Sequence, residues 1–257
     1  MNILIANDDG IWAAGIRALA DALSEVADVY ICAPDSQRSA AGHGMSMNKP
    51  LYAEEVQYEG AKKAYAISGT PADCVKLGLN LLARDGIKID MVYSGINMGS
   101  NVGTDIIYSG TVAAAIEGAM YGYPSVAVSV DSHEASHFEL ACKLAVNACR
   151  NAYTKMVPGV VLNINTPDLP EDEIKGVKFT RMGVREYYER FDEKTDENGK
   201  TQYWYGGDRV IYDGLPLDID VIANQEGYAS VSPLQFNLTA YDFVKEIEDW
   251  GPARSSA

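Results

Sequence analysis

The chain lacks the features that mark membrane-spanning, secreted and nucleic-acid-binding proteins. No apolar stretch reaches the roughly 20 residues that a membrane helix needs, and the amino terminus has no basic region of a secretory signal. Positive charge is scarce, because 21 Lys and Arg residues face 36 Asp and Glu residues, which gives a formal net charge of -15. That charge repels nucleic acid duplexes and anionic membranes. We therefore expect a cytoplasmic protein that binds neither.

Other absences narrow the class of protein further. The four cysteines, Cys32, Cys74, Cys142 and Cys149, have no CxxC spacing, which indicates reduced thiols in a reducing compartment and no metal role. Where a dinucleotide-binding fold has GxGxxG, this chain reads NDDGIWAAG, so an NAD site is disfavoured. The 47% of hydrophobic residues among 257 can build the core of one large α/β domain, or of a domain with an extension.

The first ten residues predict a buried strand that ends in two acids. The apolar run from Ile3 to Ala6 stops at Asn7-Asp8-Asp9-Gly10, and ligands of parallel sheets gather at the carboxyl ends of strands. Two adjacent carboxylates repel each other, so Asp8 and Asp9 predict a bound Mg²⁺ or Mn²⁺. The same residues are also typical of a simple turn, and this segment alone leaves both interpretations open.

Apolar periodicity predicts strands that alternate with helices along the chain. Such alternation is typical of a largely parallel sheet between two helix layers, a three-layer Rossmann-like α/β fold. Leu51 to Gln57 and Lys63 to Ser68 flank Tyr58-Glu59-Gly60 and predict a hairpin. The remaining predicted strands are Ile3 to Ala6, Asp28 to Ala33, Asp90 to Gly95, Ser125 to Val130 and Val160 to Asn165, and the predicted helices are Gly15 to Ala27, Pro71 to Arg84, Val112 to Gly122 and Glu134 to Tyr153.

Two polar loops follow predicted strands. Pro34 to Pro50 is rich in small polar residues, and Gly95 to Asp105 places three glycines among side-chain oxygens, which lets the backbone approach a ligand closely. Ser109-Gly110-Thr111 then begins a helix, and exposed N–H groups at a helix start bind phosphate. An ordinary serine cap explains the helix boundary but not the glycine-rich approach, so we favour a phosphate site.

The composition changes beyond Thr166. The segment from Arg185 to Asp208 is rich in charge and tyrosine, and Asn198-Gly199 predicts a hairpin turn. Such a hairpin buries little by itself, so we expect it to pack on another copy of the chain. We predict a single domain over 1–257, with an α/β catalytic core at 1–166 and an extension at 167–257 that holds this hairpin and a terminal helix.

One motif indicates a different chemistry. His133-Glu134-Ala135-Ser136-His137 matches HExxH, in which two histidines on a helix bind zinc and the glutamate activates water. We expect it in the first, solvated turn of the helix from Glu134 to Tyr153, without a suitable third ligand, since the only other histidine is the distant His43. A zinc peptidase is therefore kept only as an alternative.

A binding module is the second alternative. Receiver domains of two-component signalling also carry an acid pair after the first strand and hold Mg²⁺ beside a phosphoacceptor aspartate. The equivalent strand tip of this chain offers Asn97 in place of that aspartate, and the chain is about twice the length of such a module.

Several motifs together resemble one known family. ILIANDDG, APDSQRSAAGH, SGTPADCVKLGL, SGINMGSNVGTDIIYSGTVAAAIEG, LNINTP and GYASVSPLQFNLT occur in this order and cover nearly the whole chain. They closely resemble the survival protein E (SurE) family of metal-dependent nucleotidases. The resemblance implies hydrolysis of nucleoside 5′- and 3′-monophosphates, with short polyphosphate as a further substrate of some members. It also implies a cytoplasmic homodimer or tetramer that assembles through the carboxyl-terminal extension.

The resemblance also implies which residues form the site. The family's metal ligands fall on Asp8, Asp9, Ser39 and Asn97, which would bind one divalent cation per subunit. One position departs from the family pattern, because Gln235 stands where relatives often have His.

The residue types fit this chemistry. Carboxylate, hydroxyl and carboxamide oxygens suit Mg²⁺ or Mn²⁺. We hypothesise that the metal polarises the phosphoryl group and lowers the pKa of a bound water that attacks phosphorus, with an aspartyl phosphate as the alternative. No base-reading pocket is legible in the sequence. The candidate catalytic residues are Asp8, Asp9, His43 and Ser109, and the candidate phosphate-binding residues are Asn7, Gly42, Ser109, Gly110 and Thr111.

Overall fold

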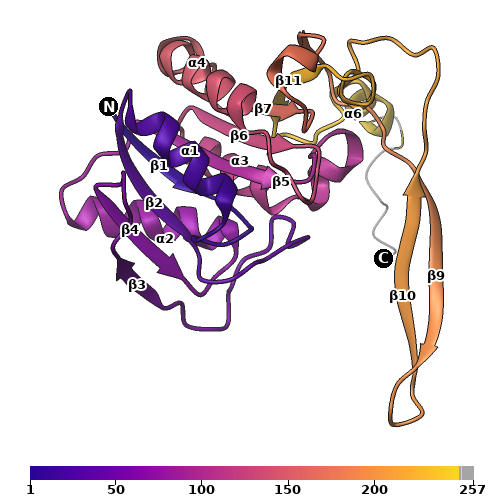
Figure 1. Cartoon of the computed structure of the whole chain (residues 1–257), viewed down its shortest axis with the longest axis horizontal. Coiled ribbons are helices and arrows are strands. Elements are labelled where there is room, and N and C mark those ends of the chain that lie inside the picture. Colours follow the sequence, from indigo (N-terminus) through magenta and orange to yellow (C-terminus); the bar gives the residue numbers. More distant parts are fainter. Residues whose placement is uncertain (249, 251–257) are drawn as a thin grey trace.

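A nine-stranded, mostly parallel sheet forms the centre of the molecule. The computed structural model describes residues 1–248 and residue 250. The strand order is β3-β4-β2-β1-β5-β6-β7-β11-β8, and β1, β2, β4, β5, β6 and β7 run parallel to one another (Figure 1). These strands are β1 (Asn2–Ala6), β2 (Asp28–Pro34), β3 (Ala53–Val56), β4 (Lys63–Ile67), β5 (Met91–Met98), β6 (Ser125–Val130), β7 (Val160–Thr166), β8 (Val177–Phe179) and β11 (Ala229–Gln235).

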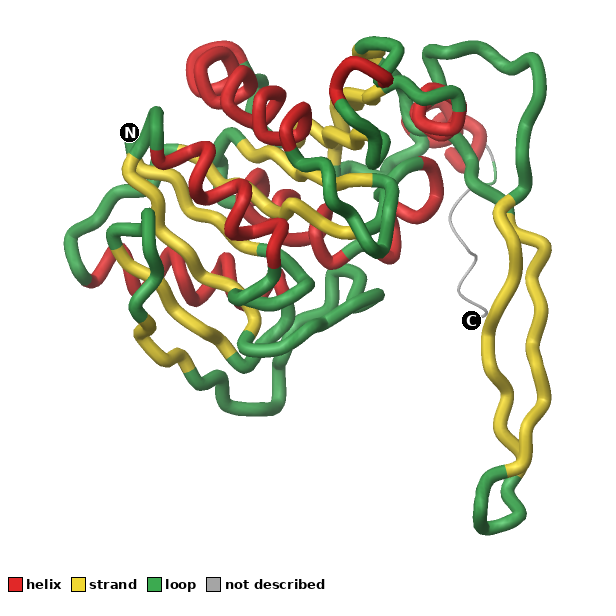
Figure 2. Tube along the Cα trace, viewed as in Figure 1, coloured by secondary structure: helices red, strands yellow, loops and turns green. Residues whose placement is uncertain are grey.

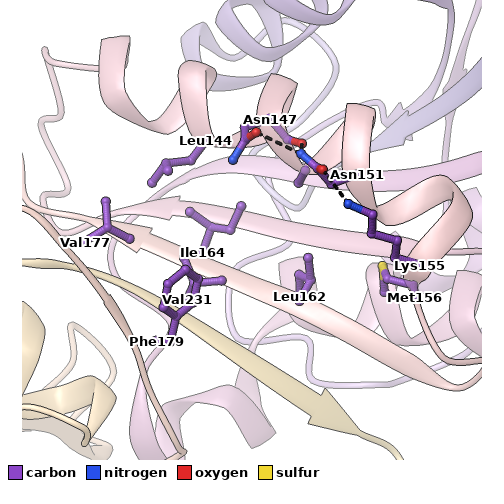
Figure 3. A pocket seen from close by; sticks show the side chains of 11 residues that line it. Leu144, Asn147, Asn151, Lys155, Met156, Leu162, Ile164, Val177, Phe179 and Val231 are labelled. Carbon is purple, nitrogen blue, oxygen red and sulfur yellow. Dashed lines mark hydrogen bonds between the residues drawn. The ribbon is translucent and has the colours of Figure 1, made fainter.

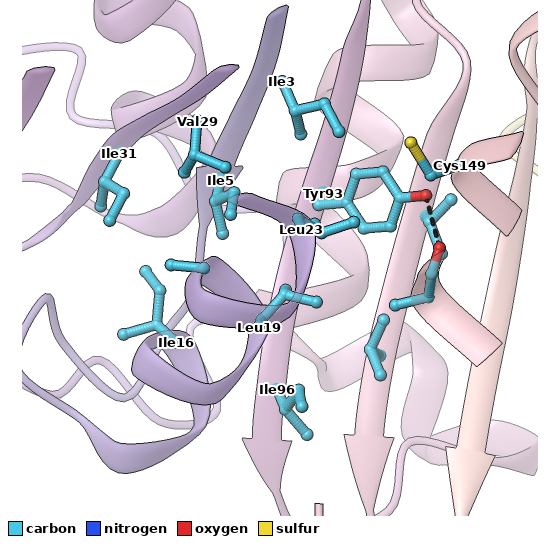
Figure 4. Close-up of a cluster of buried hydrophobic side chains, with 14 of the residues drawn as sticks. Ile3, Ile5, Ile16, Leu19, Leu23, Val29, Ile31, Tyr93, Ile96 and Cys149 are labelled. Carbon is cyan, nitrogen blue, oxygen red and sulfur yellow. Dashed lines mark hydrogen bonds between the residues drawn. The ribbon is translucent and has the colours of Figure 1, made fainter. Parts of the chain in front are cut away.

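Helices cover both faces of this sheet. On one face α1 (Ala14–Ser24) and α4 (Glu139–Lys155) bury Ile16, Leu19 and Ala145 against the strands. Figure 4 shows this cluster, in which the Tyr93 hydroxyl donates to the Ala145 carbonyl at 3.0 Å. The opposite face packs against α2 (Pro71–Arg84) and α3 (Gly110–Met120). The predicted three-layer α/β class is therefore confirmed.

The carboxyl-terminal part contributes strands to the same sheet. β11 lies antiparallel to β7, and β8 runs parallel to β11 at the sheet edge. The order of these elements in the chain is η2 (Glu171–Glu173), β8, β9 (Tyr187–Thr195), β10 (Thr201–Arg209), α5 (Asp220–Gln225), β11 and α6 (Tyr241–Glu248). The sequence patterns did not predict β8 or β11, the two strands that extend the sheet beyond β7.

The strands β9 and β10 form the predicted hairpin around Asn198-Gly199. They pair in register from Thr201 with Thr195 to Arg209 with Tyr187. Figure 2 shows these two strands standing apart from the main sheet and extending away from the body. Large side chains on the hairpin are correspondingly exposed, among them Tyr188, Phe191, Tyr203, Trp204 and Tyr205.

Among the predicted boundaries that were wrong, two lie next to polar segments of interest. β5 continues to Met98, three residues beyond Gly95, so Asn97 lies in the strand and not after it. The helix predicted from Glu134 begins only at Glu139, because the backbone N–H groups of Ser136 and His137 donate to the Asp168 carboxylate at 3.0 and 2.9 Å. Those contacts hold the preceding segment in a non-helical turn.

An apolar hollow of about 290 Å³ lies beside α4. Figure 3 shows it between α4 and the strands β7, β11 and β8, with Leu144, Leu162 and Phe179 among its lining side chains. Its walls are mostly apolar and carry no acid and no histidine. None of the described helices combines the length and apolar character that a membrane crossing requires.

Candidate metal and phosphate site

A polar cleft of about 280 Å³ opens at the carboxyl ends of the parallel strands. Its walls come from the segments that follow β1, β2 and β6, from the end of β5, and from the start of α3, because parallel strands deliver their carboxyl ends to one edge. The 3-10 helix η1 (Gly103–Tyr108) forms one rim. The lining residues are Asp8, Asp9, Gln37, Ser39, Ala40, Asn97, Met98, Gly99, Ser100, Asn101, Asp105, Tyr108, Ser109 and His133.

Asp8 is the most buried acid of the cleft. Its side chain follows β1 and accepts a hydrogen bond of 2.5 Å from the Thr111 hydroxyl at the start of α3. The helix begins very close to this carboxylate, since a Cβ on Gly110 would lie 2.9 Å from the Cβ of Asp8. Burial raises the pKa of Asp8 to about 6; the Thr111 bond opposes that rise and the charge of Asp9 adds to it.

Asp9 stands beside it in a more open position. The backbone N–H of Met98 donates to Asp9 Oδ2 at 3.2 Å, which links the tips of β1 and β5. Burial raises the pKa of Asp9, while the bond from Met98 and a bond from Gln37 act in the opposite direction. Both carboxyls therefore lie in surroundings that disfavour their negative charge.

The loop after β2 brings Ser39 to the same cleft. The N–H of Arg38 donates to the Asp8 carbonyl at 2.7 Å, and the N–H of Gly42 donates to the Tyr108 carbonyl at 3.0 Å. These two bonds hold the loop between β1 and η1. Ser39 lies between the two anchors and is exposed toward solvent.

Asn97 lines the cleft from the end of β5. Its Nδ2 donates to the Gly99 carbonyl at 2.6 Å, a contact that only the amide nitrogen can make. The carboxamide oxygen is therefore free to act as an acceptor or as a metal ligand. Gly99 has a φ of +122°, and a Cβ at this position would lie 2.9 Å from His133 Cε1, so the loop needs glycine here.

The donor set fits a hard divalent cation. The cleft brings together the carboxylates of Asp8 and Asp9, the Ser39 hydroxyl and the Asn97 carboxamide. Among the described lining residues there is no Lys or Arg to offset the buried acids. A bound cation would offset the free-energy cost of ionising these two buried carboxyls, which is the cause of both raised pKa values. Oxygen ligands favour Mg²⁺ or Mn²⁺ over zinc.

The start of α3 offers phosphate-binding groups beside the acids. The Ser109 hydroxyl caps the helix by accepting from the Val112 N–H at 3.1 Å. Helix geometry leaves the N–H groups of Gly110 and Thr111 without acceptors inside the helix, and the helix dipole favours an anion there. The Thr111 hydroxyl itself is bound to Asp8, so only its N–H is available to a ligand.

Three other predicted residues, Asn7, Gly42 and His43, do not line the cleft, and His43 lines an adjoining apolar groove. Asn7 is fully buried and its Nδ2 donates to the Gly10 carbonyl at 2.8 Å. Gly42 contributes the backbone bond to Tyr108. His43 Nε2 lies 2.8 Å from Glu117 Oε2, and Lys76 donates to the other oxygen of that buried glutamate at 2.8 Å.

The structure also adds residues that the sequence patterns missed. Gln37, Asp105, Tyr108 and His133 line the cleft. Asp105 and Tyr108 lie inside the long SGIN to YSGT block, so that motif was the signal that could have identified them.

The HExxH motif has no helix to support it. Its residues lie in the turn before α4, where His137 Nδ1 is 3.1 Å from Asp168 Oδ1. The expected helical turn is wrong, because α4 begins only at Glu139, whereas the expected exposure to solvent is confirmed for His133, which also lines the open cleft. In the part of the chain that the structure describes, no group of three or more His, Cys, Asp or Glu side chains is arranged around a metal position. The geometry therefore gives the zinc alternative no support.

Comparisons with known proteins agree with the motifs. A family profile described as "Survival protein SurE" matches residues 3–189. The chain is 43% identical over 251 residues to a protein of Petrotoga mobilis named 5′-nucleotidase SurE, covering 97% of this chain and 99% of that protein. A protein of Nostoc sp. with the same name is 44% identical over 264 residues, covering 97% and 98%. The crystal structure of the Sure protein from Aquifex aeolicus has a TM-score of 0.83 at 38% identity, covering 98% of this chain and all of that one.

Proposed function

Because this chain belongs to the survival protein SurE family, we propose that it is a metal-dependent nucleotidase that releases phosphate from nucleoside monophosphates. The observation that supports the proposal is that Asp8, Asp9 and the start of α3 line the same cleft, in which no lining Lys or Arg balances the charge of the two acids. A site of this kind binds a phosphate dianion only when a cation reverses the local sign of charge. The receiver-like module explains the acids but not this adjoining phosphate site.

We propose distinct roles for the residues of the cleft. Asp8, Asp9, Ser39 and Asn97 hold one divalent cation, Mg²⁺ or Mn²⁺. When bound, that cation would polarise the phosphoryl group and lower the pKa of a water beside it. The Thr111 hydroxyl fixes the orientation of Asp8 through its bond of 2.5 Å.

The substrate phosphate is held by the start of α3. The N–H groups of Gly110 and Thr111 and the Ser109 cap orient the phosphate, and the helix dipole stabilises its charge. Asn7 and Gly42 hold the backbone next to this position, because the Asn7 side chain donates to the Gly10 carbonyl and the Gly42 N–H donates to the Tyr108 carbonyl. Because His43 is bound to Glu117, its geometry favours a role in holding the loop of Ser39 over direct proton transfer. Attack by water and attack by an aspartate are both compatible with this arrangement.

Phosphate release from a panel of substrates tests the function. The panel contains nucleoside 5′- and 3′-monophosphates and short polyphosphate, each assayed with excess chelator and then with added Mn²⁺ or Mg²⁺. We expect hydrolysis only with metal. Full activity in excess chelator would refute the metal-dependent mechanism, and metal binding without turnover on any substrate would refute the nucleotidase assignment.

The hairpin supports a proposal on assembly. Five of its aromatic side chains, those of Tyr188, Phe191, Tyr203, Trp204 and Tyr205, are more than half exposed and lie on both faces of the two strands, and such surfaces are typical of protein interfaces. We propose a homodimer or tetramer that forms through the extension at 167–257, the segment predicted to follow a catalytic core at 1–166. We also propose a cytoplasmic location, because the cysteines are free thiols.

A further inference from the structure

Tyr108 is an exposed aromatic ring on the rim of the cleft. It ends η1 and directly precedes Ser109, the cap of α3. The residue lines the same cleft as Asp8 and Asp9, yet 67% of its surface is accessible. A large ring left exposed beside a polar cleft is available to a flat apolar partner.

The backbone around this ring is fixed. Ile106, two residues earlier, is buried in the core, and the Tyr108 carbonyl accepts the bond from the Gly42 N–H. The neighbouring Asp105 carboxylate is held by Arg185 at 3.1 Å and by the Tyr187 hydroxyl at 2.5 Å. The ring therefore projects from a segment that is anchored on several sides.

The spacing suits a nucleotide. The Cα atoms of Tyr108 and Gly110 are two peptide units apart, at most about 7 Å. A phosphate on the helix start is therefore close to the ring, and in a nucleotide one sugar separates the phosphate from the base. Stacking on an aromatic face accepts every base, since each has a π-face.

We propose that Tyr108 forms a nucleoside subsite, in which its ring stacks on the base of the substrate while the start of α3 holds the phosphate. This inference rests on the proposed function and adds how the site distinguishes nucleotides from other phosphate monoesters. The site selects substrates that carry an aromatic base, and it accepts any of the bases. The phenolic hydroxyl has no part in it.

A neighbouring groove provides the competing location for the base. It has a volume of about 370 Å³ and lies on the other side of Ser109, with walls that include Ile106, Ile116, Leu234 and Phe236. This groove is apolar, but the cleft residues Asp8 and Asp9 do not line it. Substitution of Phe236 tests this location separately.

The test compares two nucleotides with a sugar phosphate that has no base, on matched variants. AMP, UMP and ribose 5-phosphate are assayed with Mn²⁺ on the full chain and on Tyr108→Ala, Tyr108→Phe and Phe236→Ala. Tyr52→Ala is the control, because Tyr52 is equally exposed, at 71%, and lies outside the cleft. Circular dichroism and thermal unfolding establish that each variant is folded.

We expect Tyr108→Ala to raise KM for AMP and UMP by roughly ten- to hundredfold, the usual cost of a lost base stack. The kcat value should stay nearly unchanged, because stacking is equally strong in ground and transition states. Ribose 5-phosphate should be hydrolysed equally by Tyr108→Ala and the unchanged chain. Tyr108→Phe should behave like the unchanged chain.

An equal loss on AMP and ribose 5-phosphate would overturn the proposal, since it would indicate a structural role for Tyr108. A nucleotide-specific loss in Phe236→Ala with none in Tyr108→Ala would also overturn it and place the base in the groove. If no substrate is hydrolysed, the proposed function fails, and calorimetric binding of AMP against ribose 5-phosphate with Mn²⁺ still decides the subsite. Equal affinities of these two ligands for the unchanged chain would refute it.

Discussion

Replacing Asp8 with Asn should stabilise the metal-free protein at neutral pH. Asp8 is only 6% exposed, and burial together with the charge of Asp9 raises its pKa from 3.8 to about 6. Its folded pKa exceeds the unfolded value, so the folded state binds the proton more tightly and the ionised carboxylate destabilises the fold. The difference corresponds to about 3 kcal/mol, at 1.36 kcal/mol for each pH unit.

The pH dependence follows from the same two values. Above about pH 6 the full destabilisation is present in the unchanged chain, and it disappears as the pH falls from 6 toward 3.8. The variant has no charge to lose, and its amide oxygen still accepts the Thr111 hydroxyl. We therefore expect the stability gain of Asp8→Asn to be largest at pH 8 and nearly absent at pH 4.

Urea unfolding in excess chelator at pH 8, 6 and 4 measures this gain. Asp213→Asn, which removes an exposed carboxyl, is the control and should change little. Added Mn²⁺ should reverse the order, because a ligand that binds only the folded state stabilises the unchanged chain and not the variant. A variant that is less stable than the unchanged chain at pH 8 without metal, or a gain independent of pH, would refute the reasoning.

Three further predictions concern the metal, the cleft rim and the hairpin. Asn97→Ala should weaken Mn²⁺ affinity, measured by calorimetry, by at least the roughly 10- to 100-fold that loss of an outer-shell partner costs, and unchanged affinity would exclude the side chain as a ligand. His133→Ala should lower kcat/KM for AMP by up to about tenfold (1.4 kcal/mol), because the ring lines the cleft and its electrostatic interaction with Asp9 lowers the pKa of that carboxyl. Glu134→Ala should leave kcat/KM unchanged, and equal effects of both variants would contradict this distinction. If the proposed oligomer forms through the hairpin, replacing residues 190–206 with an Asn-Gly turn should lower the number of subunits found by analytical ultracentrifugation, and an unchanged number of subunits would exclude the hairpin as an interface.

Local patterns in the sequence were sufficient to predict the α/β class and most elements. Periodicity reports which face of an element is buried, so the strand at Ile3 to Ala6 and the helix from Pro71 to Arg84 were visible without the fold. The position of Asp8 and Asp9 at a strand tip followed as well, because parallel strands end at one edge. The hairpin around Asn198-Gly199 was encoded by its turn residues alone.

Only the tertiary structure decided which side chains meet. The hydrogen bond from Thr111 to Asp8 joins residues 103 positions apart. In the sheet, β11 lies between β7 and β8, although these two strands follow each other in the chain. The start of α4 at Glu139 depends on the distant carboxylate of Asp168, so no local helix signal could place it. Sequence periodicity encodes the burial of each element, whereas contacts between distant elements depend on how the elements pack, and this packing brings His133, which follows β6, to the cleft.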